Sequence, residues 1–160
     1  MAEREYADIL TTAVVAAGAT GPLVLVPMAD MTVLAGIWTG MFAAAAKRSG
    51  HELDAGFFAK VPTAVLVGGG LYKVGSKLLQ RFVMAAAATT GIGTGPVMGA
   101  NGILNALATL RAGRVFIELC EDEEFDPRDL GRLIPLIQEA VKPWPTVVEI
   151  KVVVRFFRLN

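Results

Sequence analysis

The sequence is poor in the side chains that build metal centres and many active sites. It contains one cysteine, Cys120, and one histidine, His51. One cysteine cannot form an intramolecular disulfide, and a structural zinc site needs several cysteine or histidine ligands. A disulfide scaffold and a structural zinc site are therefore excluded, and the reducing, cytoplasmic side of a membrane is the expected location.

Charged side chains are also scarce. They make up 19% of the chain and hydrophobic residues 54%, against about 25% and about 45–50% in an average soluble domain. The 15 basic and 15 acidic residues cancel, so the chain has no overall positive charge with which to bind nucleic acid. This composition favours contact with lipid or extensive burial between subunits.

The charges that are present gather towards the C-terminus. Residues 1–110 carry 13 of the 30 charged side chains, and residues 111–160 carry the other 17. We therefore expect an apolar helical membrane or membrane-surface region over 1–110 and a polar region over 111–160. The first eight residues are of mixed charge, unlike the basic start of a secretory signal, so we expect no cleaved leader.

Three uncharged runs stand out, and they cover residues 9–29, 31–46 and 82–110. A helix that spans a bilayer needs about 20 apolar residues, so only the first and third runs are long enough. Glycines and prolines interrupt both of these, and each is expected to form two shorter helices joined by a bend. Such half-length helices can enter a membrane as re-entrant hairpins.

Helix-breaking glycines and prolines, together with residues that cap helix ends, predict the order of the elements. Helices are expected at about 3–17, 27–48, 71–89, 96–118 and 127–142, with a kinked element after Asp54 that contains Pro62. The first helix of the polar region is amphipathic, and we expect Asp126 to cap it and Pro135 to kink it. The predicted fold class is mainly α, a bent, Gly/Ala-rich helical bundle with a C-terminal amphipathic helix and one terminal β-strand.

Small residues predict where these helices touch. Gly36 and Gly40 are four residues apart, as are Gly95 and Gly99. Without side chains, two helix backbones can approach closely, which is how helices associate in lipid. We therefore expect a homo-oligomer.

The terminal strand is predicted over residues 146–158, where the pattern has a period of two. The alternating apolar positions are Val148, Ile150, Val152, Val154 and Phe156. A half-buried strand has this period, and a single strand cannot satisfy its own backbone. Two interpretations stay open: the strand pairs with another chain, which is a copy of itself or a partner protein, or it pairs with an unrecognised internal strand.

No motif for catalysis or ligand binding is complete. The glycine-rich stretch 91–99 lacks the Lys-Ser or Lys-Thr of a phosphate loop, and the acidic residues of 121–129 lack the order of an EF-hand loop. His51 has no second ligand or nucleophile near it in sequence. The sequence thus predicts no catalytic residue, no cofactor and no metal site.

Asp30 is the carboxylate that stands alone between two uncharged runs. At membrane depth it would be a functional group, with Lys73 or Lys77 as its partner. At the surface it would stabilise the N-terminus of a helix through the helix dipole. Both interpretations remain open.

The chain resembles the DUF697 domain family, which is found with bacterial GTPases, and helical membrane proteins of the EcsC type. The resemblance covers roughly residues 10–120, and it rests on Gly21-Pro22 to Asp30 with Met41 and Gly50, and on Gly91-Ile92-Gly93 to Thr109 with Gly113 to Ile117. Thr90 stands where the family usually has a proline. The resemblance implies a helical, membrane-associated domain without catalytic residues and with a GTPase as a partner.

These observations predict a non-enzymatic, membrane-associated oligomeric anchor or scaffold that recruits a partner through its terminal strand. It would lie in the cytoplasmic membrane or at its cytoplasmic face. One alternative is an oligomeric pore or hydrophobic conduit lined by Asp30. The other is a soluble helical protein bound to a partner.

Overall fold

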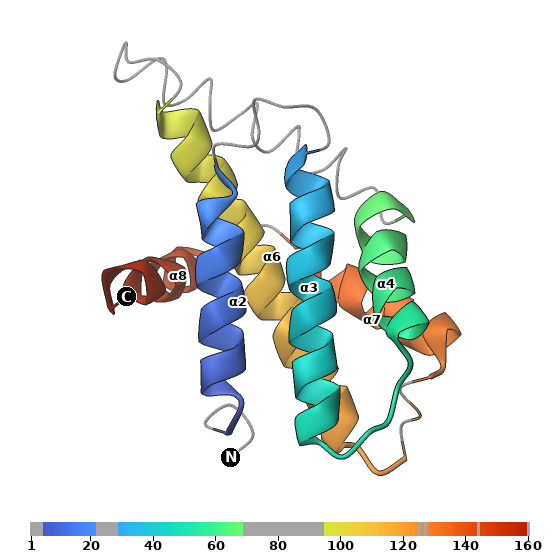
Figure 1. The fold of residues 1–160 in the computed structure, drawn as a ribbon. Coiled ribbons are helices and arrows are strands. Elements are labelled where there is room, and N and C mark those ends of the chain that lie inside the picture. The colour runs from blue at the N-terminus through green and yellow to red at the C-terminus, as the bar shows by residue number, and fades with distance from the viewer. Residues whose placement is uncertain are drawn as a thin grey trace.

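The computed structural model of the chain describes residues 5–21, 29–68, 95–124, 126, 128–143 and 145–159, and these residues are mainly helical (Figure 1). Within them there is no strand. The elements are α2 (Ala7–Ala19), α3 (Ala29–Arg48), α4 (Ala55–Thr63), the π-helical turns η2 (Ala64–Gly68), α6 (Gly95–Glu121), α7 (Leu130–Val141) and α8 (Val147–Leu159). The predicted helix over 71–89 lies outside the described residues.

Helix α6 is the centre of the arrangement (Figure 1). Helices α2 and α3 run antiparallel to each other and both contact α6, while α4 lies beside α3. Helix α7 contacts α6 and η2, and α8 contacts α6 and α2 on the other side of the bundle. None of the helices in the described ranges combines the length and the hydropathy that crossing a bilayer requires.

The core forms where α3, α4, α6 and α7 meet. Trp38 and Phe42 of α3 and Phe116 of α6 are fully buried, with ring centroids 6.0 Å apart for Trp38 and Phe42 and 4.4 Å apart for Phe42 and Phe116. Val61 of α4 and Ile137 of α7 close the same cluster. Burial of each such side chain contributes about 1.5–3 kcal/mol, so this cluster fixes the positions of four helices.

Two glycines of α6 face close neighbours, and Gly102 lies where α2 crosses α6. A Cβ atom on Gly102 would lie 2.4 Å from the carbonyl oxygen of Gly18, and one on Gly113 would lie 2.5 Å from a methyl carbon of Leu10. The Gly102 distance is to a backbone atom and leaves no room for a side chain, whereas a Cβ on Gly113 would meet the flexible side chains of Leu10 and Met41, which can move aside. The two positions are about three turns apart on one face of α6, so α2 can approach this face closely along its length.

The predicted C-terminus of α3 and the predicted start of α4 are confirmed. Gly50 has a φ of +80°, and the amides of Gly50 and His51 donate to the carbonyls of Lys47 and Ala46, which is the Schellman arrangement of a helix C-terminus. Asp54 then caps α4 by accepting a hydrogen bond from the Phe57 amide at 2.8 Å. After Pro62 the helix changes to the π-helical turns of η2.

The predicted cap of the amphipathic helix was wrong. The helix begins at Leu130, not at residue 127, and Asp129 caps it by accepting from the Arg132 amide at 3.2 Å. Asp126 instead accepts from the Arg128 amide at 2.9 Å. This local hydrogen bond forms an Asx turn, which competes with helical structure and places the helix start three residues later. Pro135 does lie inside the helix.

The predicted strand over 146–158 was also wrong, because Val147–Leu159 form the helix α8. Thr146 and Glu149 make a capping box at its start. The Glu149 amide donates to Thr146 Oγ1 at 3.2 Å, and Glu149 Oε2 accepts from the Thr146 amide at 2.9 Å. The alternation of Val148, Ile150, Val152, Val154 and Phe156 therefore does not mark one face of a strand.

Candidate functional site

One group of side chains in the described residues has the chemistry of a nucleophilic site. It lies at the C-terminal end of α3 and contains Tyr6, Ser49, His51 and Cys120, and we call it the α3-end cluster. The hydroxyls of Tyr6 and Ser49 are 2.9 Å apart, and His51 Nε2 is 2.8 Å from the backbone carbonyl oxygen of Cys120. Serine and cysteine can act as nucleophiles beside a histidine base, so this cluster is a candidate catalytic site.

The α3-end cluster has no activated nucleophile. Cys120 is buried, and desolvation raises the pKa of its thiol to about 12, so the group is a neutral thiol at pH 7. A carbonyl oxygen only accepts hydrogen bonds, so His51 Nε2 carries the proton and cannot act as a base at that atom. The cluster instead fastens the loop after α3 to the end of α6.

A neighbouring ion pair also connects the ends of two helices. Arg48 of α3 binds the carboxylate of Asp8 on α2 through both terminal nitrogens, with Nη2 2.9 Å from Oδ2. This contact lowers the pKa of Asp8 to about 2. Arg48 also donates to the carbonyl of Glu5 at 2.6 Å. The C-terminus of α3 is thereby tied to the N-terminus of α2.

A row of polar side chains runs along the uncharged part of α6. Asn101, Asn105 and Thr109 are four residues apart and so share one face. The Asn105 amide donates to Thr20 Oγ1 at 2.7 Å, and the Trp38 indole donates to Thr109 Oγ1 at 2.8 Å. These bonds hold α2 and α3 against α6. Sequence reasoning missed the row, although its four-residue spacing is visible in the sequence.

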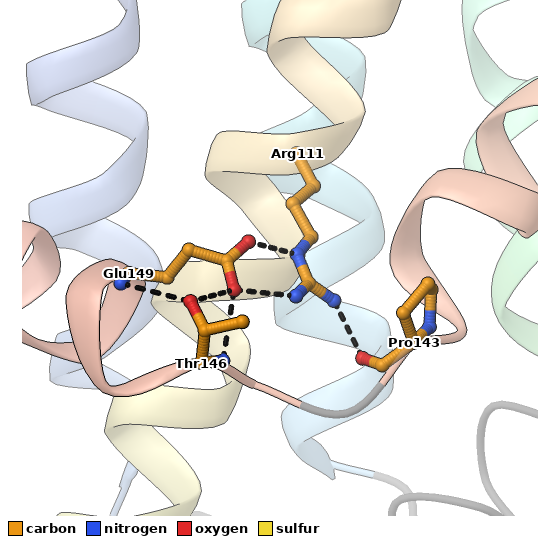
Figure 2. Close-up of polar contacts among 4 residues, drawn as sticks. All are labelled: Arg111, Pro143, Thr146 and Glu149. Carbon is orange, nitrogen blue, oxygen red and sulfur yellow. Dashed lines mark hydrogen bonds and ion pairs between the residues drawn. The ribbon is translucent and has the colours of Figure 1, made fainter.

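Arg111 connects α6 to α8 (Figure 2). Its Nε and Nη2 atoms donate to the two carboxylate oxygens of Glu149, both at 2.8 Å, and Nη1 donates to the Pro143 carbonyl at 2.6 Å. The two side chains are 12% and 27% exposed. The guanidinium of Arg111, followed by the bonds from Thr146, lowers the pKa of Glu149 to about 2. This contact fixes the start of α8.

The acidic residues of the segment 121–129 are exposed to solvent. Glu121, Asp122, Glu123, Glu124, Asp126 and Asp129 are all exposed. In the part of the chain that the structure describes, no group of three potential ligands is placed to hold a metal ion. The polar clusters described above make contacts between helices.

No family model, curated protein or solved structure matches the chain.

The glycines expected at helix contacts lie on the outside of their helices. Gly36, Gly40 and Gly99 are exposed, and a Cβ atom at any of them would meet no atom within 4 Å. Gly95 is the first residue of α6. Within the chain, the close contacts are made by Gly102 and Gly113 instead.

Asp30 is the second residue of α3, so it lies in the first helical turn. That position is the one at which a carboxylate stabilises the helix dipole. Its expected partners Lys73 and Lys77 lie outside the described residues.

One side of α3 is exposed and without charge. We call it the α3 outer face, and it consists of Thr32, Val33, Gly36, Gly40 and Ala44, all of which are exposed. The last three follow one another at four-residue spacing, so small residues line a continuous strip along the helix. The face belongs to the uncharged run 31–46. Because its residues are small, a second helix could pack closely against it.

Proposed function

We propose that the protein is a non-enzymatic, membrane-associated scaffold that associates with copies of itself through the α3 outer face. The observation that carries the proposal is the exposure of Gly36 and Gly40 in the middle of a helix, with nothing within 4 Å of either position. A glycine inside a helix costs about 1 kcal/mol relative to alanine. Within the residues that the structure describes, neither glycine makes a close contact that would offset this cost.

Contact with a second α3 helix explains both glycines. Gly102 and Gly113 show what glycine does elsewhere in this chain, because both permit a helix to approach closely. Small residues at four-residue spacing serve the same purpose between helices of separate chains. Two copies related by a two-fold axis would bring the same face of each together, and no charged group of residues 31–46 would lose its water.

Two further observations support the membrane and non-enzymatic parts of the proposal. The sequence is 54% hydrophobic, and it resembles helical membrane-associated families that have no catalytic residues. The polar clusters of the described residues have neither an activated nucleophile nor a metal-binding group. The cytoplasmic face of a membrane is accordingly the proposed location.

The test compares the mass of the full chain with that of a Gly40→Leu variant by light scattering in mild detergent. Leucine fits in the monomer because the space around Gly40 is open, so the variant should fold while the contact between chains is blocked. We expect an oligomer for the wild-type chain and a monomer for Gly40→Leu. Ala59→Leu, at an exposed position of α4, is the control and should remain oligomeric. Equal masses for all three chains would refute the role of the α3 outer face.

A further inference from the structure

We propose that the outward face of α8 binds the surface of a bilayer that contains anionic phospholipid. The inference deepens the proposed function and rests on its membrane association, since it names the element and the lipid chemistry responsible. It is independent of the α3 outer face, which lies on another helix.

The geometry of α8 separates an inner face from an outer face. Val153 is fully buried against α6 and α2, whereas Val147 and Val148 are 69% and 71% exposed. Lys151 is exposed as well. Since residues three and four apart share a helix face, Val147, Val148 and Lys151 lie together on the outside. Helix α8 extends away from the rest of the bundle at the edge of the molecule (Figure 1).

The charge of this part of the chain is positive. Residues 142–160 contain four basic side chains and one acidic side chain. The acidic one is Glu149, whose carboxylate is held by Arg111. Arg155 and Arg158 follow Lys151 by four and seven residues in the sequence, which is the spacing of one helix face.

The neutral overall charge conceals this concentration of positive charge. Residues 118–129 carry seven acidic side chains and one basic side chain, so their negative charge more than offsets the positive charge of residues 142–160. A surface of anionic lipid attracts a basic segment over about a Debye length, roughly 8–10 Å. The acidic segment would be repelled, so the charge distribution favours one orientation on the surface.

The two valines favour a bilayer over other anionic partners. A polyanion such as nucleic acid would be held by the basic residues alone and would leave Val147 and Val148 in water. The interface of a bilayer offers anionic head groups and, a few ångströms deeper, acyl chains that accept apolar side chains. A second copy of α8 is disfavoured, because contact would bring like charges together.

The experiment is sedimentation of the full chain with two kinds of vesicle. One kind is phosphatidylcholine alone, and the other contains phosphatidylglycerol in addition. We expect the wild-type chain to bind the anionic vesicles more tightly. Lys151→Glu should weaken this binding about tenfold, because it removes one attraction and adds one repulsion. Lys60→Glu on α4, where the side chain is also exposed, makes the same change in net charge and should bind as the wild type does.

A second variant tests the apolar contact without altering charge. Val147→Ser combined with Val148→Ser should weaken binding to the anionic vesicles about tenfold, since two side chains lose their burial in the interface. Far-ultraviolet circular dichroism confirms that each variant is folded. An unchanged affinity for this double variant would show that charge alone acts, and it would refute insertion by α8.

The remaining outcomes separate this inference from the proposed function. Strong vesicle binding that Lys151→Glu and the double variant leave unchanged would refute the role of α8 and leave membrane association standing. Absence of wild-type binding to both kinds of vesicle would refute the inference and the membrane part of the proposed function together. Self-association is measured separately, without vesicles.

Discussion

At the scale of single residues, the glycines of α6 have two different roles that the sequence does not distinguish. Gly99 and Gly102 are three residues apart in one helix, yet only Gly102 meets another backbone. Both lie in the uncharged run 82–110. Only the position of α2 decides which of them must lack a side chain, and that position depends on contacts distant in sequence.

We expect Gly102→Ala to lower the free energy of unfolding by about 1–3 kcal/mol, because the new methyl group would overlap the Gly18 carbonyl. Gly99→Ala is the control. It should raise the free energy of unfolding by up to about 1 kcal/mol, since alanine favours the helix and the space is open. Urea denaturation measures both. A smaller effect for Gly102→Ala than for Gly99→Ala would contradict the close crossing of α2 and α6.

The ion pair of Arg111 and Glu149 makes the stability depend on pH. The folded-state pKa of Glu149 is lowered from 4.5 to about 2, so its contribution is fully present above pH 4.5 and is lost as the pH falls towards 2. We expect a loss of about 1–3 kcal/mol from this group across that interval. Denaturation at several pH values should show that acid lowers the free energy of unfolding less for Glu149→Gln than for the wild-type chain. If the free energy of unfolding changed with pH in the same way for both chains, Glu149 would make no such contribution to stability.

Cys120 should be inert while the chain is folded. Its burial and its pKa of about 12 leave very little thiolate at neutral pH. We expect a thiol reagent such as iodoacetamide to modify it only after denaturant is added, and mass spectrometry would follow the reaction. Rapid modification of the native chain would mean that Cys120 in the α3-end cluster is accessible and reactive, and it would contradict this prediction.

At the scale of elements, helix ends were predictable where their signals are local. The stop at Gly50 and the cap at Asp54 each depend on residues within about one helical turn, and both are present in the structure. The approximate extent of α6 was predictable from an uncharged run followed by charged residues. The start of α7 was displaced because Asp126 and Asp129 are both good caps, and the sequence alone does not rank them.

The prediction failed for α8 because its pattern has two interpretations. Val148, Val152 and Phe156 recur every four residues, so the same apolar side chains fit a helix and a strand. The Thr146 and Glu149 pair was the signal that separated the two, since a threonine followed three residues later by glutamate is a capping box. The bond from Arg111 to Glu149 strengthens this start, but it links positions too distant in sequence to be predicted.

We expect Thr146→Ala to weaken the start of α8. Loss of a threonine cap costs about 1 kcal/mol of helix stability, and Glu149 would lose the two hydrogen bonds that it makes with the Thr146 hydroxyl. Amide hydrogen exchange should become faster across the first turns of α8, while α7 serves as the internal reference. An exchange pattern with alternate residues protected would indicate a strand and would contradict the helix.

At the scale of the whole molecule, two uncovered surfaces stand out among the described residues. The α3 outer face carries two exposed glycines and no charge. The outer face of α8 carries two exposed valines beside a lysine. The sequence predicted the first surface through Gly36 and Gly40, but it could not show which side of α3 remains exposed, because that depends on how α2, α4 and α6 surround the helix.

The measurement that tests the central claim most directly is sedimentation equilibrium of the unaltered full chain in aqueous buffer over a range of concentrations. The α3 outer face should pair with a second copy even when no lipid is present. Its small residues allow close packing, and no charged group loses its water in the contact. The account predicts a mass of at least two chains, which decreases on dilution. A single-chain mass at every concentration, without detergent or partner protein, would contradict it.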